Sequence, residues 1–169
     1  MLNTKYIIIN PNAAPVVNNY ACGNAWFVNN LVFADNADEE LSELEKINIR
    51  KTAVADSRFS NLLQGKNYRN DTPGSIKLVD YTPNKLTYKS DASADKIAIF
   101  SEIYYDKGWI ASIDGEEVDH FRADYTLRAL FIPEGEHTIV FEFRPKSYYM
   151  GEKISYAGSL LYFCNVSWG

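Results

Sequence analysis

The feature that most constrains this chain is a long stretch, from about residue 72 to residue 146, in which apolar and polar residues alternate. Successive side chains of a β-strand point to opposite faces, so this alternation predicts strands with one buried face. Asp114-Gly115 stands between two such runs and fits the two-residue type I′ turn of a β-hairpin. Seven expected strands at short, even spacing predict an antiparallel β-sandwich or jelly roll.

The residues before this stretch mix helix and strand signals. Lys5 to Asn10 (KYIIIN) predicts a buried strand, and Ala25 to Ala34 predicts a strand that is interrupted at Asn29-Asn30. Asn36, with Glu39 three residues later, is typical of a capping box at the start of a helix. We expect the acidic residues of this helix to form its solvated face: Glu39, Glu40, Glu43 and Glu45.

Together these patterns predict a mainly β protein that is α+β overall. We expect residues 1–71 to form a smaller N-terminal α+β portion that packs on the sandwich, with a boundary near the loop NYRNDTPG. Residues 72–146 would form the sandwich, and residues 147–169 a C-terminal helix.

Charge and cysteine content narrow the range of partners. The chain has 17 basic and 22 acidic residues and a formal net charge of −5, with no basic run. Binding of nucleic acid through a positive face is therefore not expected. Cys22 and Cys164 match no metal-ligand spacing, and whether they form a disulfide is left open.

Signatures of catalysis are scarce. The sequence contains no Gly-rich phosphate loop, HExxH, GxSxG or CxxC motif, so we expect no catalytic residue, metal or cofactor. His120 is interpreted as an ordinary surface histidine. Glycosidases use two carboxylates, but nothing distinguishes a pair among these candidates: Glu102, Asp106, Asp114, Glu116, Glu117, Asp119 and Asp124.

A cluster of aromatic and arginine residues is the best candidate for ligand binding. Aromatic faces stack on sugar rings, and arginine side chains hold hydroxyl or anionic groups. Ordinary sheet packing with arginine–aromatic contacts explains the same pattern and remains the alternative. The candidate ligand-binding residues are Tyr104, Tyr105, Trp109, Arg122, Tyr125 and Arg128.

A series of short motifs in fixed order extends over nearly the whole chain. The series is Leu2 to Ile8, Gly23 to Val28, Tyr104-Tyr105, Gly108-Trp109, Ile113-Asp114-Gly115, Phe121-Arg122-Ala123, Arg128-Ala129, Ile132-Pro133, Gly135 to Ile139 and Phe143-Arg144-Pro145. In this order the motifs resemble the C-terminal extracytoplasmic region of the YfhO-like bacterial membrane proteins. Asp106 stands where proline is common in that family, so the turn there departs from the usual pattern.

The resemblance implies a functional context. Members of the family are polytopic and similar to lipid-linked glycosyltransferases of cell-envelope assembly, whose chemistry belongs to membrane-embedded parts. The resemblance implies a non-catalytic accessory domain on the outer face of a bacterial membrane, with the transmembrane portion of the parent protein as partner. A cell-envelope glycan or a lipid-linked sugar would be its ligand.

Alternatives stay open at this point. The domain could serve a purely structural role against the transmembrane bundle, or act as a stand-alone glycoside hydrolase. The N-terminal apolar run is too short for a signal peptide, and no run reaches the ~18 apolar residues of a membrane span. We therefore expect a chain that is soluble as written, either an excised domain or a truncated gene product.

Overall fold

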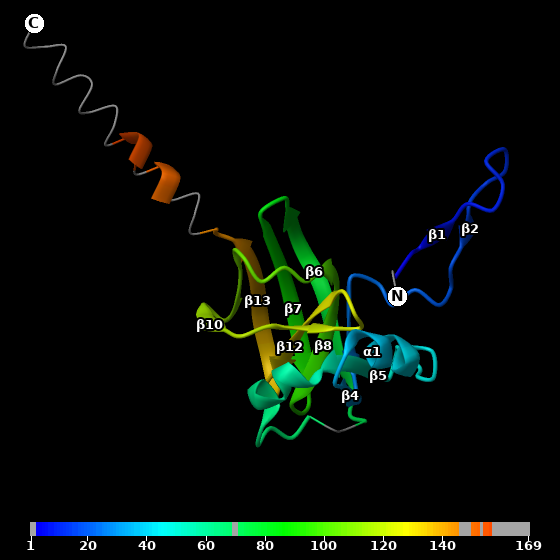
Figure 1. Cartoon of the computed structure of the whole chain (residues 1–169), viewed down its shortest axis with the longest axis horizontal. Coiled ribbons are helices and arrows are strands. Elements are labelled where there is room, and N and C mark those ends of the chain that lie inside the picture. Colours follow the sequence, from blue (N-terminus) through cyan, green and yellow to red (C-terminus); the bar gives the residue numbers. More distant parts are fainter. Residues whose placement is uncertain (1–2, 69–70, 146–149, 153, 157–169) are drawn as a thin grey trace, which may run out of the picture.

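The computed structural model describes residues 3–68, 71–145, 150–152 and 154–156. Two packed β-sheets make up the body of the molecule, as the alternating pattern predicts (Figure 1). This arrangement confirms a mainly β fold built as a sandwich of largely antiparallel sheets.

The first sheet has five strands in the order β10-β9-β13-β7-β6, all antiparallel. Asp114 and Gly115 join β9 to β10 with φ angles of 52° and 91°, the two positive values that a type I′ turn requires. The predicted hairpin is therefore present. The strands are β6 (Gly74–Thr82), β7 (Lys85–Ala92), β9 (Trp109–Ile113), β10 (Glu116–Val118) and β13 (Gly135–Phe143).

The second sheet has six strands in the order β3-β8-β12-β11-β5-β4, and only β4 and β5 pair in parallel. β3, β4 and β5 come from the N-terminal portion, so that portion supplies strands to the sandwich in addition to packing on it. The strands of the six-stranded sheet are β3 (Ala25–Val28), β4 (Asn30–Ala34), β5 (Thr52–Asp56), β8 (Lys96–Ile103), β11 (Phe121–Ala123) and β12 (Leu127–Ile132).

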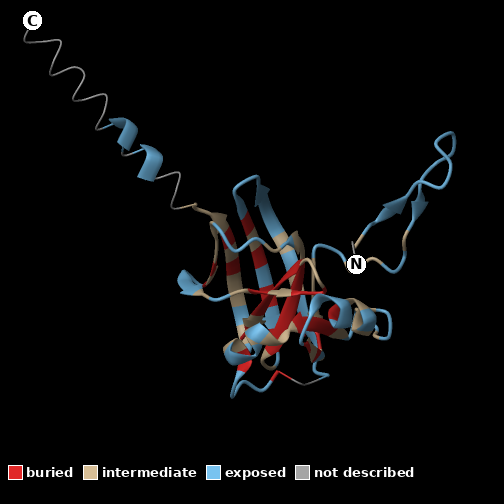
Figure 2. Cartoon of the chain, in the orientation of Figure 1, coloured by how far each residue is buried: buried red, intermediate tan, exposed pale blue. Residues whose placement is uncertain are grey.

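Two hydrophobic clusters hold the layers together. One lies between the sheets and includes Tyr88, Phe100, Leu130 and Phe141. The other covers the opposite face of the six-stranded sheet and includes Ile97, Ile99 and Phe121. The six-stranded sheet is thus buried on both faces, and its central strands β8 and β12 are buried along most of their length (Figure 2).

Two short helices flank the six-stranded sheet: α1 (Ala37–Leu44) and the 3₁₀ helix η1 (Ser57–Leu63). The Asn36 side chain accepts a hydrogen bond from the Glu39 backbone N–H at 3.0 Å, which confirms the predicted N-cap. The predicted solvated acidic face is wrong for Glu40, which is 1% exposed. Its partners come from β11 and from the turn after it, a tertiary contact that helical periodicity does not reveal.

The ends of the chain also differ from expectation. Tyr6–Ile7 (β1) pairs with Val16–Val17 (β2) in a separate two-stranded sheet whose four residues are all exposed, so the predicted burial of this strand is wrong. Residues 150–152 and 154–156 are helical, in agreement with the predicted C-terminal helix. Its remaining residues, Cys164 among them, lie outside the described residues.

Candidate functional site

A polar hollow of about 380 Å³ opens where the β9–β10 hairpin meets the segments around Tyr104 and His120. We call it the Trp109 hollow. It combines aromatic rings with carboxylates, a mixture that suits a ligand carrying both apolar faces and hydroxyl groups. The lining residues are Tyr104, Asp106, Trp109, Ile110, Ala111, Glu117, Val118, Asp119 and His120.

Trp109 is the first residue of β9 and lies opposite Phe143 of β13. Gly108 precedes it with a φ of +117°, and a Cβ at this position would lie 2.8 Å from the Phe143 ring. The backbone N–H of Arg144 donates to the Gly108 carbonyl at 2.6 Å. Glycine is therefore required here, and it fixes the point at which the Trp109 ring leaves the sheet.

Arg128 supports Trp109 from inside the sandwich. Its guanidinium carbon lies 4.0 Å from the centre of a Trp109 ring and 5.2 Å from that of Phe141, a cation–π arrangement. The side chain is 2% exposed, and its Nε donates to the Ile103 carbonyl at 3.1 Å. Burial lowers the pKa of Arg128, although the guanidinium keeps its charge. Arg128 thus positions Trp109 from beneath.

His120 belongs to a column of aromatic rings. Its ring centre lies 5.5 Å from that of Tyr104 and 5.7 Å from that of Phe141, and Tyr104 in turn contacts Phe59 edge-on at 5.9 Å. Burial lowers the pKa of His120 to about 4, with the nearby Arg128 charge acting in the same direction. The interpretation of His120 as an ordinary surface histidine is therefore wrong. It is a packed, neutral ring in the wall of the hollow.

Three exposed carboxylates, Asp106, Glu117 and Asp119, stand around the hollow. The sequence singled them out only by residue type. The hairpin turn at Asp114-Gly115 carries the signal that could have found them, since its register brings Glu117 opposite Ser112 of β9. Within the described part of the chain, no group of three or more histidine, cysteine or acidic residues could hold a metal ion. Carboxylate oxygens accept hydrogen bonds from hydroxyl groups, although that of Glu117 also lies 3.5 Å from the Arg144 guanidinium.

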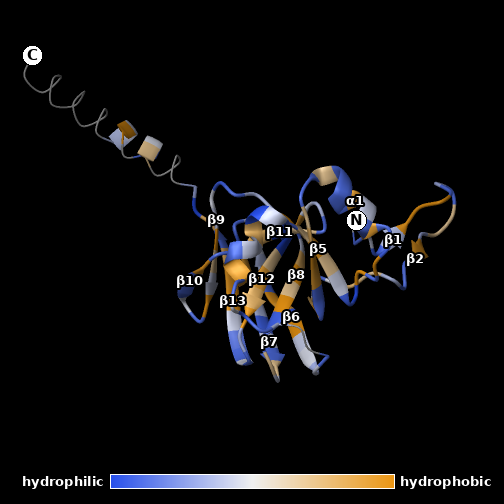
Figure 3. Cartoon of the chain, turned by 60° about the horizontal axis from the view of Figure 1, so that its bottom comes forward, coloured by the Kyte–Doolittle hydropathy of each residue, from blue (hydrophilic) through white to orange (hydrophobic). Residues whose placement is uncertain are grey.

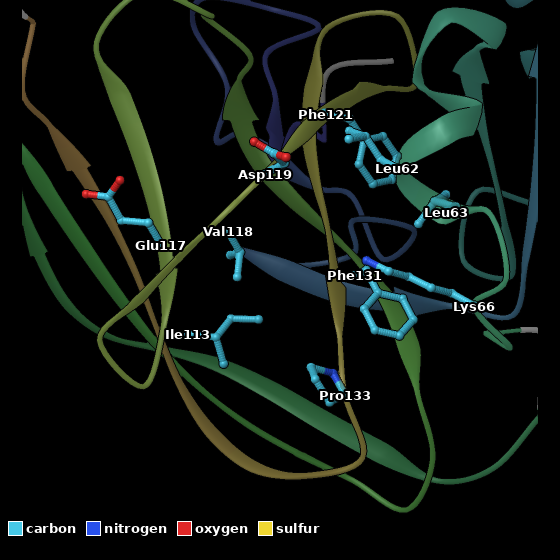
Figure 4. Close-up of a pocket in the computed structure, with 10 residues that line it drawn as sticks. All are labelled: Leu62, Leu63, Lys66, Ile113, Glu117, Val118, Asp119, Phe121, Phe131 and Pro133. Carbon is cyan, nitrogen blue, oxygen red and sulfur yellow. The ribbon is translucent and has the colours of Figure 1, made fainter.

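A second hollow of similar volume, about 380 Å³, lies on the other side of residues 117–119. Figure 4 shows that Val118, Ile113 and Phe131 surround it, while the Glu117 carboxylate points away from them. The Lys66 amine lies 4.3 Å from the Phe131 ring centre. This hollow is mainly apolar, so residues 117–119 separate a polar surface from an apolar one.

Tyr105 lies beside the Trp109 hollow. It is 49% exposed and lines an adjoining hollow of about 710 Å³ together with Trp109 and Phe143. Trp109 thus forms part of the wall of both. The structure therefore brings four of the six candidate residues into one region: Tyr104, Tyr105, Trp109 and Arg128.

Arg122 and Tyr125 have a different environment and line neither hollow. Arg122 donates to the buried Glu40 carboxylate at 2.8 Å, and the Tyr125 backbone N–H donates to the other oxygen of Glu40 at 2.7 Å. Tyr125 has a φ of 68° in the turn after β11. This pair fastens α1 to the sheet.

Comparison with known proteins gives one match. No curated protein and no solved structure matches the chain. None of the helices described in the structure is long and apolar enough to cross a membrane. The family model for the bacterial membrane protein YfhO matches residues 47–155, which include the whole Trp109 hollow. The chain therefore belongs to the family of the bacterial membrane protein YfhO.

Proposed function

We propose that this chain is a non-catalytic, extracytoplasmic accessory domain of a membrane glycosyltransferase-like protein, and that it binds an envelope glycan or the sugar of a lipid-linked precursor. Family membership supports the membrane context. The observation that carries the proposal is the Trp109 hollow, in which an aromatic ring held from beneath by Arg128 stands among three carboxylates.

The chemistry of the hollow suits a sugar ring. A pyranose presents an apolar face, which stacks on an aromatic ring, and equatorial hydroxyls, which donate to carboxylates. Because Arg128 already fixes the orientation of Trp109, little side-chain entropy is lost when a ligand stacks on it.

The charge around the hollow selects among ligands. Its nine lining residues include three acids and neither lysine nor arginine. A phosphate group would be repelled at this position. We therefore expect the sugar portion of a ligand to occupy the hollow, with any phosphate outside it.

A purely structural role is the second candidate. The edge strand β6 exposes Val79 at 52%, beside a bulge, and Tyr81 at 61%, opposite Leu86 near the end of the strand. Exposed apolar side chains on an edge strand favour contact with another protein surface, here the transmembrane bundle of the parent protein.

The two candidates are separated by a screen of bacterial envelope glycans. The full chain is compared with D106N/D119N, which removes two acceptor charges at the hollow, and with D80N/D91N, which removes two exposed charges on β6 and β7. We expect binding by the wild type and by D80N/D91N, and at least about a tenfold weaker affinity for D106N/D119N. Equal binding by all three proteins would overturn the site, and absence of binding would favour the structural role.

A further inference from the structure

The β1–β2 arm projects from the sandwich and contains several hydrophobic residues, coloured orange in Figure 3. Many of their side chains are exposed. Exposure of this many large apolar residues on one segment is unusual for a free surface and marks a contact site. The exposed residues are Tyr6 (53%), Ile7 (45%), Ile8 (69%), Ile9 (79%), Val16 (51%), Val17 (52%) and Tyr20 (81%).

The base of the arm is fastened to the body of the molecule. The Asn3 side chain donates to the Gly23 carbonyl and, at 3.2 Å, to the Ser101 hydroxyl, and it accepts from the Cys22 N–H at 2.6 Å. Arg50 donates to the Asn19 carbonyl at 2.9 Å. The arm therefore has a defined starting point on the sandwich, while its apolar residues extend beyond both hydrophobic clusters.

Charge is distributed very unevenly between the arm and the rest of the chain. Lys5 is the only charged side chain in residues 1–34, and all 22 acidic residues follow from Asp35 onward. The Lys5 amine lies 5.3 Å from the Tyr6 ring centre. An anionic surface would repel the acidic body but not the arm, so it would be met by the arm first.

From these observations we infer that the β1–β2 arm contacts the interfacial region of a lipid bilayer. The family is one of membrane proteins. The arm contains tyrosines, aliphatic residues and a lysine, a mixture that is enriched in protein segments at the interface between membrane and water. Ile8 and Ile9 are adjacent in sequence and both are exposed, so apolar side chains project from more than one side of the arm. This arrangement suits an arm that is surrounded by lipid headgroups.

The backbone of the arm limits how deeply it enters. Only two residue pairs join β1 to β2, Tyr6 with Val17 and Ile7 with Val16, so most peptide groups along the arm lack a strand partner. Such groups are not tolerated in the hydrocarbon core of a bilayer. The arm therefore belongs among the headgroups. This inference is independent of glycan binding in the Trp109 hollow.

The test is sedimentation of the full chain with vesicles of phosphatidylcholine, with and without phosphatidylglycerol. The variant I8S/I9S removes the two most exposed aliphatic side chains of the arm and leaves both strand pairs intact. The matched control V79S/Y81S removes two exposed apolar side chains from β6. An unchanged unfolding midpoint verifies that each variant is folded.

We expect the wild type and V79S/Y81S to bind both kinds of vesicle. I8S/I9S should bind at least about tenfold more weakly. Absence of vesicle binding by the wild type, or equal binding by I8S/I9S, would overturn the inference. A dimer in solution that I8S/I9S abolishes, without vesicle binding, would assign the arm to a second copy of the chain and also overturn it.

Discussion

The two sheets of the sandwich bury their residues in different ways. The five-stranded sheet keeps one face in solvent, and its strand β7 alternates strictly between exposed or half-buried and buried residues. The six-stranded sheet is covered on both faces and has charged groups in and around it that are almost fully buried, including Glu40, Asp124 and Arg128. We infer that apolar packing stabilises the first sheet and that the second depends in addition on buried polar contacts, among them the ion pair of Glu40 with Arg122.

The largest expected effect is on the shared core. Phe141 of β13 is fully buried and contacts Tyr88 and Phe100 edge-on at 6.2 and 4.8 Å. F141A should lower the free energy of unfolding by about 4 kcal/mol, because it leaves a cavity between the sheets. Urea denaturation measures this loss. Y81A removes a side chain that is 61% exposed and should differ from the wild type by at most about 0.5 kcal/mol, and similar losses in both variants would contradict this packing.

A charge deletion next to each sheet sharpens the comparison. E40A removes the buried partner of Arg122 and of the Tyr125 N–H, and should cost about 3 kcal/mol. E142A removes one of the two exposed partners of Arg144 on the five-stranded sheet, Glu117 being the other, and should cost less than about 0.5 kcal/mol. Both losses are read from urea denaturation at neutral pH. Equal costs would show that the two sheets do not differ in their dependence on paired charges.

Asp124 predicts a pH dependence that originates at the six-stranded sheet. Burial raises the pKa of Asp124 to about 6, despite a hydrogen bond from the Val54 N–H at 2.9 Å. The folded state thus holds this proton more tightly than the unfolded state. The stabilising contribution is complete below pH 4 and is lost as the pH rises through 6, about 3 kcal/mol in all.

The variant D124N isolates this contribution. Asparagine tolerates the φ of 48° and can still accept from Val54, but it does not titrate. Relative to the wild type, D124N should gain stability between pH 4 and pH 7. Parallel stability profiles for the two proteins, measured by urea denaturation across this range, would contradict the raised pKa.

His120 should give the free energy of unfolding a pH dependence of opposite sign to that of Asp124. The effect should be smaller, because the His120 ring is only half-buried. Its pKa is lowered to about 4, so the unfolded state binds the proton first, and stability falls as the pH drops from 6.5 to 4. H120F keeps the ring contacts with Tyr104 and Phe141 but does not titrate. Between pH 6.5 and pH 4 it should therefore lose about 1 to 2 kcal/mol less stability than the wild type. If H120F loses as much stability in acid as the wild type, His120 is not held neutral by the fold.

Local signals predicted much of the fold. The Asp114-Gly115 turn, the Asn36 cap and the break between β3 and β4 depend on neighbouring residues and were visible in the sequence. The burial of Glu40 was not, since its partners Arg122 and Tyr125 are more than eighty residues away. For the same reason the sequence grouped Arg122 and Tyr125 with Trp109, although the fold places them against α1.

The N-terminal arm shows the converse limit. An apolar run such as Tyr6 to Ile9 is typical of a buried strand, but burial requires a neighbour, and the described structure gives this run only the short strand β2. Similarly, Trp109 could be identified from the sequence as a candidate because it is aromatic. The packing of Arg128 beneath it could not, because it follows from the pairing of β12 within the second sheet.

The central claim, that the Trp109 hollow binds glycan, is tested most directly by the indole signals in a heteronuclear NMR titration with the glycan that ranks first in the screen. Trp26 provides an internal control, because its indole N–H donates to the Ile49 carbonyl at 2.9 Å, away from the hollow. We predict that the Trp109 indole signal shifts with saturable dependence on glycan concentration while that of Trp26 stays in place. A saturating glycan that leaves the Trp109 signal unmoved would contradict the account.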